Sequence, residues 1–287
     1  MARTLEPYQL VERSIITKYR KVLWNPFIEA VKRYEMIQPG DRIAVCISGG
    51  KDSMLLAKLM QQLQKHSDFP FELVFLVMDP GYNELNRQKI ESNAALLNIP
   101  VTIFESDIFE VADSAGKSPC YLCARMRRGY LYSRAQELGC SKIALGHHFN
   151  DVVETTLISM FYGSQLQAML PKLHSTNFDG MTLIRPLYCV HEDDIIAWAR
   201  DNSLEFIQCA CRLTERSAAD TGDVNVSKRK EIKLLLRRLR QGNPNIEKSI
   251  FNSIHAVALD TMPGFKTGGV EHSFLERFNA MESTEDE

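Results

Sequence analysis

The sequence predicts an α/β fold, a doubly wound parallel sheet with helical extensions at the N-terminal and C-terminal ends. Short apolar runs alternate along the chain with longer segments of helical periodicity, which is the order of strand–helix–strand units. These runs show little polar alternation, as expected for parallel strands that are covered on both faces. A ligand crevice is therefore expected at the carboxyl ends of the strands.

The expected elements follow in a regular order. A helical segment with a break near Pro26 opens the chain, and Pro39-Gly40-Asp41 forms a turn before the first strand. Strands are expected at residues 42–47, 72–78, 101–105 and 142–145, with a last strand or extended segment at 183–187. Helices are expected at residues 7–36 (one or two), 53–65, 84–97, 122–138, 151–161, 192–201, 228–240 and 245–259, and a loop at 212–227.

The chain has 287 residues, enough for one large domain with appendages. We expect an N-terminal helical segment over residues 1–38 and a nucleotide-binding domain over 39–211. A C-terminal helical region is expected over 212–280, followed by an acidic disordered tail over 281–287.

The composition excludes several classes of protein. Hydrophobic residues make up 45% and charged residues 24%, and the net charge is −2, so the chain as a whole is no polyanion binder. No apolar stretch approaches the length of a membrane span, and the polar N-terminus is no signal peptide. A cytoplasmic protein is expected, in which the seven cysteines are thiols or metal ligands.

The most informative motif joins the first strand to the next helix. It reads Ser48-Gly49-Gly50-Lys51-Asp52-Ser53. Its glycines allow backbone N–H groups to approach an anion, and the helix N-terminus and Lys51 add positive charge. The spacing is neither that of a Walker loop nor that of a dinucleotide fingerprint. The motif therefore predicts a phosphate site of another class.

A second strand–turn–helix motif begins at Gly146-His147-His148. Gly146 permits close backbone approach, Asn150 or Asp151 can cap the helix, and we expect His147, Asp151 and Glu154 to line the same crevice. A capped helix with surface histidines is the alternative. Asp79, at the end of the second strand, suits either an adenosine contact or the turn before Pro80-Gly81.

The cysteines suggest a metal site. Cys120 and Cys123 form a Cys-x-x-Cys, and Cys209 and Cys211 form a Cys-x-Cys downstream. A redox pair, a zinc site and an iron–sulfur site are all compatible with this pattern, although the context is unlike that of a thioredoxin pair. The other three, Cys46, Cys140 and Cys189, are expected to be buried small hydrophobes.

Together the motifs resemble a known family. The hexapeptide resembles the PP-loop of ATP pyrophosphatases, which have the adenine-nucleotide α-hydrolase-like fold. The run from Cys120 to Gly129, followed by Gly146-His147-His148 and Glu154-Thr155, resembles the tRNA 2-thiocytidine synthetase family. The resemblance extends from about Pro39 to Cys211.

The resemblance implies a sulfur transferase that acts on tRNA with ATP, Mg²⁺ and a [4Fe-4S] cluster. Adenylation of a cytidine C2 oxygen would precede its replacement by sulfur. Lys51, Asp52 and Asp151 are implied as catalytic residues. The implied nucleotide-binding residues are Ser48, Gly49, Gly50, Lys51, Asp52, Ser53, Asp79, Gly146 and His147. The implied cluster ligands are Cys120, Cys123 and Cys211, the last preferred to Cys209.

The resemblance also implies partners. The sulfur donor would be a cysteine desulfurase or free sulfide, and a homodimer is compatible with the family. Basic residues suggest where RNA binds: three arginines follow the Cys-x-x-Cys, and a basic amphipathic helix lies near the C-terminus. The alternative for these charges is a solvated helix face. The arginines are Arg125, Arg127 and Arg128, and the basic helix carries Lys228, Arg229, Lys230, Lys233, Arg237, Arg238 and Arg240.

Two other functions remain open at this stage. One is a ligase or amidating enzyme of the same fold, similar to lysidine synthetases, with structural zinc on the cysteines. The other is a non-catalytic ATP-binding sulfur carrier, which ATP–pyrophosphate exchange would distinguish from both enzymes.

Overall fold

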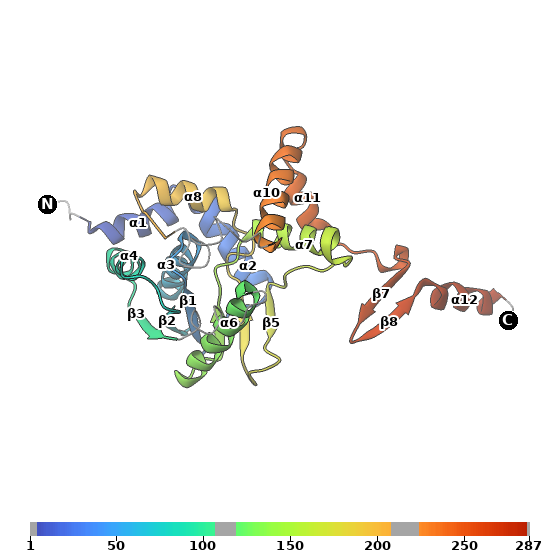
Figure 1. The fold of residues 1–287 in the computed structure, drawn as a ribbon, viewed down its shortest axis with the longest axis horizontal. Coiled ribbons are helices and arrows are strands. Elements are labelled where there is room, and N and C mark those ends of the chain that lie inside the picture. The colour runs from blue at the N-terminus through green and yellow to red at the C-terminus, as the bar shows by residue number, and fades with distance from the viewer. Residues whose placement is uncertain (1–4, 107–118, 208–223, 286–287) are drawn as a thin grey trace. The chain divides into compact units, whose positions relative to one another are not determined.

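The computed structural model describes residues 5–106, 119–207 and 224–285 (Figure 1), without the side chains of residues 119–125, 224–227 and 280–285. The described chain divides into two units, residues 1–235 and 236–287. The boundary falls within helix α10, Val224–Gly242. No helix in the described segments combines the length and apolarity that a membrane span requires.

In the first unit, six described strands form one sheet in the order β3-β2-β1-β4-β6-β5. The bounds are β1 Arg42–Ile47, β2 Glu72–Asp79, β3 Val101–Glu105, β4 Lys142–Ala144, β5 Lys172–His174 and β6 Thr182–Ile184. All neighbouring pairs are parallel except β5 and β6, which are antiparallel. The parallel α/β prediction is confirmed for the sheet as a whole, and β5 is an edge strand that the sequence analysis missed. Its three residues are too few to show a periodicity.

Helices connect and cover the strands. Their bounds are α1 Pro7–Ile16, α2 Asn25–Arg33, α3 Lys51–His66, α4 Glu84–Leu96, α6 Pro119–Glu137, α7 Phe149–Gly163 and α8 Glu192–Asp201. A π-helical turn at Arg20–Trp24 precedes α2, which carries Pro26 in its first turn, where a missing N–H costs no hydrogen bond. The break expected near Pro26 is therefore an interruption just before it.

Packing in the hydrophobic core explains why the strands consist mostly of apolar residues. Ala44 and Cys46 of β1 belong to a buried cluster with Tyr132 and Ala135 of α6, while α3 packs on β1 and β2. Successive side chains of a strand point to opposite faces, so β1, which is buried at every position after Arg42, needs apolar residues from Ile43 to Ile47. Chain order reverses around β1, because β2 lies on one side of it and β4 on the other. Such a switch point is where α/β sheets bind ligands, beyond the carboxyl ends of the strands.

The second unit is small. It contains the end of α10, then α11 (Ile246–Ser253), a short 3₁₀ turn (Leu259–Thr261), β7 (Gly264–Thr267), β8 (Val270–Ser273) and α12 (Phe274–Glu285). The β7–β8 hairpin turns at Gly268-Gly269, both with positive φ, as a two-residue hairpin loop requires. The sequence analysis missed this hairpin and expected one helix over 245–259. It also expected a disordered tail from residue 281, where the structure continues α12 to Glu285.

Candidate functional site

The loop between β1 and α3 can be built only with glycine at its second position. Gly49 has φ +83°, a conformation that residues with a Cβ rarely adopt. A Cβ there would also lie 2.5 Å from Cγ1 of Ile90 and 2.7 Å from Cδ1 of Ile207. Both the backbone conformation and the space therefore require Gly49.

The side-chain hydroxyl of Ser53 stabilises this loop through hydrogen bonds. The Ser48 N–H donates to Ser53 Oγ at 3.1 Å, and the Ser53 hydroxyl donates to the Gly50 carbonyl at 2.9 Å. Gly50 is the N-cap of α3 and supplies no side-chain cap. The first turn of α3 thus has backbone N–H groups that no capping side chain occupies, and such groups bind phosphates.

The second motif packs directly against the first. A Cβ on Gly146 would lie 3.1 Å from the backbone nitrogen of Ser53, so only glycine allows the β4–α7 turn to approach the loop this closely. His148 caps α7: its N–H donates to Asp151 Oδ2 at 3.0 Å, and its Nδ1 accepts from the Asp151 N–H at 3.4 Å. The N-cap residue is therefore His148, which had not been expected, and Asp151 completes a capping box from the third helical position, whereas Asn150 is not part of the cap.

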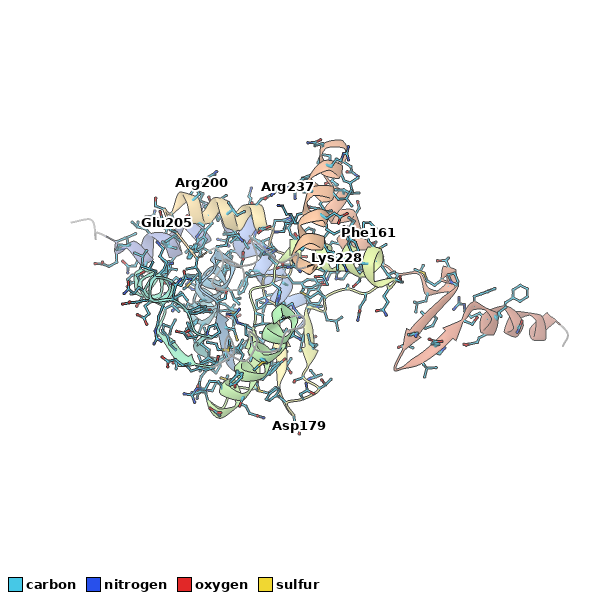
Figure 2. The ribbon with its side chains drawn as sticks, viewed as in Figure 1. Phe161, Asp179, Arg200, Glu205, Lys228 and Arg237 are labelled. Carbon is cyan, nitrogen blue, oxygen red and sulfur yellow. The ribbon has the colours of Figure 1, made fainter. Side chains whose placement is uncertain are left out.

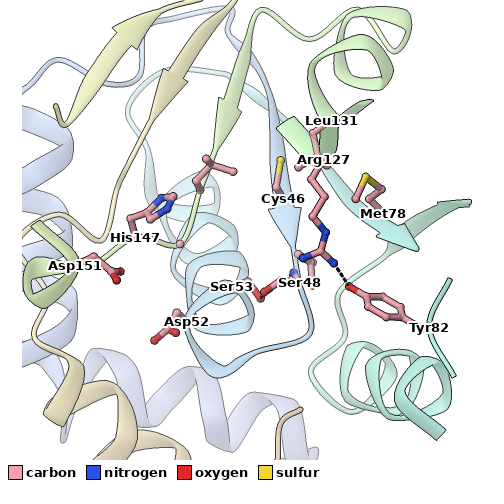
Figure 3. A pocket seen from close by; sticks show the side chains of 13 residues that line it. Cys46, Ser48, Asp52, Ser53, Met78, Tyr82, Arg127, Leu131, His147 and Asp151 are labelled. Carbon is pink, nitrogen blue, oxygen red and sulfur yellow. Dashed lines mark hydrogen bonds between the residues drawn. The ribbon is translucent and has the colours of Figure 1, made fainter. Parts of the chain in front are cut away.

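A pocket of about 320 Å³ lies where the two motifs meet, at the carboxyl ends of β1, β2 and β4 (Figure 3). Its lining residues are Cys46, Ile47, Ser48, Asp52, Ser53, Met78, Tyr82, Arg127, Leu131, Leu145, Gly146, His147 and Asp151. Asp52, Asp151 and His147 lie together on one side, and Arg127 donates to the Tyr82 hydroxyl at 3.4 Å on the other (Figure 3). One side of the pocket thus carries ionisable side chains, and the other is formed by aromatic and aliphatic side chains beside one guanidinium group.

Lys51 is held by two carboxylates. Its Nζ lies 3.1 Å from the carboxylate of Asp52 and 3.1 Å from Glu192 Oε1. Burial alone would lower the pKa of Lys51, but these two carboxylates outweigh it and raise that pKa. Burial likewise raises the pKa of Glu192, yet Lys51, His148 and Lys233 lower it to about 2. Lys51 is therefore a cation and Glu192 an anion at neutral pH.

Helix α10 adds two cations to the same group. Arg229 Nη1 lies 3.2 Å from Asp151 Oδ1, and Lys233 Nζ lies 3.1 Å from Glu192 Oε2. Burial raises the pKa of Asp151, but the net pKa is lowered because His148, His147 and Arg229 oppose it. The two cations that had been expected to contact RNA thus form ion pairs with carboxylates beside the pocket.

Glu154 differs from the other carboxylates. Its side chain is 3% exposed, and both nearby cations, Arg229 and Lys233, lie 3.6 Å from it, beyond hydrogen-bond distance. Burial raises its pKa to about 7, because it exceeds the opposing effect of the two cations. Glu154 therefore gains and loses a proton near neutral pH, which is the range useful for proton transfer.

His147 is kept neutral. Burial, and then the charge of Arg185, lower its pKa to about 4. Its Nδ1 is buried and has no hydrogen-bond partner within the described residues. A ligand in the pocket could supply the missing partner.

The predicted nucleotide residues do not all lie in the pocket. Ser48, Asp52, Ser53, Gly146, His147 and Asp151 line it, whereas Gly49, Gly50 and Lys51 are not among the lining residues. Asp79 lies outside the lining: its Oδ1 accepts from the N–H groups of Gly81 and Tyr82, and its Oδ2 from Arg87. These are turn contacts, and an adenosine contact of Asp79 stays a prediction.

The cysteines separate into two groups. Cys46 and Cys140 are buried and Cys189 is half-buried, and burial raises the thiol pKa of each, that of Cys46 to about 12. These three are thiols at neutral pH; Cys46 and Cys140 are buried as expected, whereas Cys189 is only half-buried. Cys120 and Cys123 fall in the first turn of α6, but their side chains, together with Cys209 and Cys211, lie outside the described residues.

The described carboxylates do not by themselves make a metal site. No cluster of three or more His, Cys, Asp or Glu side chains with ligating geometry occurs in the part of the chain that the structure describes. Asp52 and Asp151 lie beside the phosphate loop with Lys51 and Arg229 as partners. Mg²⁺ is commonly bound by one or two carboxylates together with substrate phosphates, and that chemistry fits these two residues.

Several residues of the site were not predicted. Glu192 was expected only as the first residue of a helix, and Tyr82, Met78 and Leu131 were given no role in the site. Their sequence neighbourhoods contain no motif, because they reach the pocket only when β2, α6 and α8 pack around β1. The run His191-Glu192-Asp193-Asp194 was the one available signal, and it indicates a helix start more directly than a site.

Comparison with known proteins agrees with this geometry. Residues 17–214 match the family described as PP-loop domain. A tRNA-cytidine(32) 2-sulfurtransferase of Geobacter metallireducens is 35% identical over 241 residues, 83% of this chain and 90% of the relative. The protein of the same name from Alkalilimnicola ehrlichii is 38% identical over 234 residues, 79% of this chain and 70% of the relative.

A solved structure has a similar fold. It is the U34-tRNA thiolase from Methanococcus maripaludis with its [4Fe-4S] cluster, with a TM-score of 0.64 and 19% identity. The match covers 84% of this chain and 80% of that one. The likeness shows that the two chains share the α/β architecture.

Proposed function

This chain belongs to the tRNA-cytidine(32) 2-sulfurtransferase family, and we propose that it replaces the C2 oxygen of a tRNA cytidine with sulfur at the expense of ATP. The observation that carries the proposal is the pocket at the switch point of the sheet, where Ser48, Ser53 and neutral His147 meet and beside which Lys51 pairs with Asp52. Substrate, cofactors and the roles of individual residues belong to the proposal.

ATP would bind with its phosphates on the loop. The N–H groups at the start of α3 and the ammonium of Lys51 complement the phosphate oxygens. The adenosine would lie towards Met78, Leu131 and Tyr82, which form the less polar side of the pocket. Mg²⁺ would be held by the phosphates together with Asp52 and Asp151.

The activation step forms one bond and breaks one. The C2 oxygen of the base attacks the α-phosphorus, and the bond from that phosphorus to the β-phosphate oxygen breaks, so pyrophosphate leaves with the bonding electrons. Negative charge builds on the leaving oxygens, and Lys51 stabilises it once it exchanges its contact with Glu192 for phosphate. Arg229 and Lys233 lie close enough to the rim to assist by the same exchange.

Replacement of oxygen by sulfur completes the reaction. A sulfur nucleophile adds to C2, and AMP departs with the former C2 oxygen. A [4Fe-4S] cluster with three cysteine ligands, when bound, leaves one iron open to a sulfur ligand. Cys120, Cys123 and Cys211 would hold it, as the resemblance to the family implies, with Cys209 as the neighbouring alternative.

The remaining partners follow from this reaction. A cysteine desulfurase or free sulfide would supply sulfur, the tRNA substrate places the protein in the cytoplasm, and a homodimer is the proposed assembly. Among the basic residues of α10, Lys228 lies over the ring of Tyr162 at 4.9 Å and forms no ion pair with a described carboxylate. We propose Lys228 as an RNA contact in place of Arg229 and Lys233.

The test is anaerobic purification, followed by the visible spectrum and by counts of iron, sulfide and zinc. We expect broad visible absorption with about four irons per chain. Cys123→Ala should lose the iron and retain ATP binding, whereas Cys140→Ala, which removes a described buried thiol, should retain both. Zinc in place of iron would contradict the sulfur chemistry and favour a ligase with a structural metal site.

A further inference from the structure

A second cavity, of about 450 Å³, lies between α6 and the β5–β6 hairpin. Arg128 and Tyr132 of α6 form one wall, and His174, Ser175, Phe178 and Arg185 belong to the hairpin and its flanks. Tyr132 stacks on Phe178 with ring centroids 5.0 Å apart, and Gln136 of α6 donates to the Asp179 carbonyl at 3.4 Å. Figure 2 shows Asp179 at the tip of this hairpin. We call this cavity the arginine pocket.

The arginine pocket contains positive charge that no carboxylate balances. Arg185 is 9% exposed, its Nε is buried with no partner in the described structure, and its Nη1 donates to the Leu170 carbonyl. Within the described residues, neither Arg185 nor Arg128 has a carboxylate at ion-pair distance, and no Asp or Glu lines the pocket. Burial, and then the charge of Arg128, lower the pKa of Arg185 to about 10.

Two other described arginines have carboxylate partners. Arg134, six residues further along α6, lies 2.8 Å from Glu137, and Arg87 lies within 3.2 Å of three carboxylates. A buried cation without a counter-ion is costly, so Arg185 favours an anionic ligand, and the exposed Arg128 adds a second guanidinium that the same anion can contact. The aromatic pair and the hydroxyl-rich loop beside them suit a ligand with a sugar or a base attached to the anion.

The arginine pocket adjoins the 320 Å³ pocket at the carboxyl ends of β1, β2 and β4, which we call the nucleotide pocket. Arg127 and Leu131 of α6 line the nucleotide pocket, while the next residues, Arg128 and Tyr132, line the arginine pocket. The charge of Arg185 is also felt at His147, whose pKa it helps to lower. A ligand that enters the nucleotide pocket as part of a longer chain would therefore have its neighbouring groups near Arg128 and Arg185.

We propose that the arginine pocket binds a backbone phosphate of the RNA substrate close to the nucleotide that is modified, with Arg128 and Arg185 as the anion-binding groups. The inference rests on the proposed function, since it needs an RNA substrate. It assigns a phosphodiester and its sugar to a cavity outside the ATP site. Guanidinium groups bind phosphate oxygens in pairs, and such contacts position a nucleic acid without reading its sequence.

The test compares two arginines of one helix. Binding of unmodified tRNA to the full-length protein is measured at several salt concentrations for wild type, Arg128→Ala and Arg134→Ala. Arg128 is exposed and forms no ion pair in the described structure, so its removal should leave the fold intact. We expect Arg128→Ala to weaken tRNA binding about tenfold and to reduce the slope of log K against log salt by about one. Arg134→Ala should bind tRNA as the wild type does.

Two results would overturn the proposal. One is equal affinity and equal salt dependence in Arg128→Ala and Arg134→Ala. The other is a loss of pyrophosphate or inorganic phosphate binding in Arg128→Ala with tRNA binding unchanged, which would assign the cavity to a free anion. A wild-type protein that binds no tRNA would contradict the proposed function itself, and this failure is distinct from both. A conservative Arg185→Lys variant, checked for folding by circular dichroism, should show a smaller weakening in the same direction.

Discussion

The two pockets on either side of α6 differ in whether the cations around them have carboxylate partners. Beside the nucleotide pocket, Lys51 pairs with Glu192 and Arg229 pairs with Asp151, while Arg127 in the pocket wall contacts the Tyr82 hydroxyl. In the arginine pocket Arg128 and Arg185 share no such partner within the described residues. The first arrangement suits a ligand that brings its own cation, as Mg²⁺–ATP does. The second suits a bare phosphodiester. We infer that the balance of cations and carboxylates around each pocket of the free protein indicates the net charge of the ligand that binds there.

The largest effect is expected from removing Lys51, the cation between Asp52 and Glu192 beside the nucleotide pocket. Lys51→Ala should lower ATP–pyrophosphate exchange by about 10²- to 10³-fold, because a group that stabilises developing charge is lost. Lys65→Ala is the control, since Lys65 lies on the same helix and pairs with Glu12 away from the pocket. Exchange at the wild-type rate in Lys51→Ala would remove Lys51 from the mechanism.

The raised pKa of Glu154 gives a prediction on stability. The folded protein binds this proton up to about pH 7, whereas the unfolded chain releases it near pH 4.5, so stability falls as pH rises between these values. At pH 8 Glu154→Gln should exceed the wild type in free energy of unfolding by about 3 kcal/mol, at 1.36 kcal/mol per pKa unit. Below pH 4.5 this difference should vanish.

Urea denaturation at a series of pH values measures the effect of Glu154→Gln. Glu12→Gln provides a control in which the change in free energy of unfolding has the opposite sign. Burial raises the pKa of Glu12, but Lys58 and Lys65 outweigh it, so the net pKa is lowered. Glu12→Gln should therefore be less stable than the wild type at neutral pH and approach it as pH falls below the ordinary pKa. The same pH dependence in both variants would contradict the environment described for Glu154.

Two glycines, one near each pocket, differ in the space available for a Cβ. Gly49 of the phosphate loop and Gly180 of the β5–β6 hairpin both have positive φ, but only Gly49 lacks space for a Cβ. Gly49→Ala should cost about 1–3 kcal/mol of stability more than Gly180→Ala, because crowding adds to the backbone strain that both share. Thermal unfolding of both variants measures the difference, and equal losses would contradict the close packing at Gly49.

The smallest expected effect is a change in ATP affinity when the negative charge of Glu192 is removed. Glu192→Gln removes one anion from the nucleotide pocket and frees Lys51, so ATP without Mg²⁺ should bind about fivefold more tightly, equivalent to about 1 kcal/mol. Calorimetric titration measures this, with Glu205→Gln as a control on an exposed ion pair. Weaker binding in Glu192→Gln would show that the carboxylate helps to hold ATP.

Much of the fold can be predicted from local sequence. The strands β1 and β3 and the helix α8 have the bounds that the sequence predicts, because each combines an apolar pattern with a clear turn or cap signal. The β7–β8 hairpin was missed although Gly268-Gly269 signals a tight turn, since the flanking strands are short and mostly exposed. A four-residue strand has little pattern to detect.

The site was predictable only where a motif marks it. The phosphate loop and Gly146 are recognisable because their geometry demands particular residues at fixed spacing. Glu192 and Arg229 were not, because their roles arise when distant helices pack around β1. The arginine pocket had no signal beyond Arg128, since Arg185 follows a strand like any other polar residue.

The most direct test of the central claim is the nucleoside content of tRNA after reaction. Anaerobic protein with its cluster, unmodified tRNA, sulfide and ATP are combined, and the nucleosides are identified by mass spectrometry. The account predicts 2-thiocytidine that requires ATP and is absent with Lys51→Ala. A reaction that consumes ATP and produces a modified nucleoside without sulfur, or no modification from a protein with an intact cluster, would contradict it.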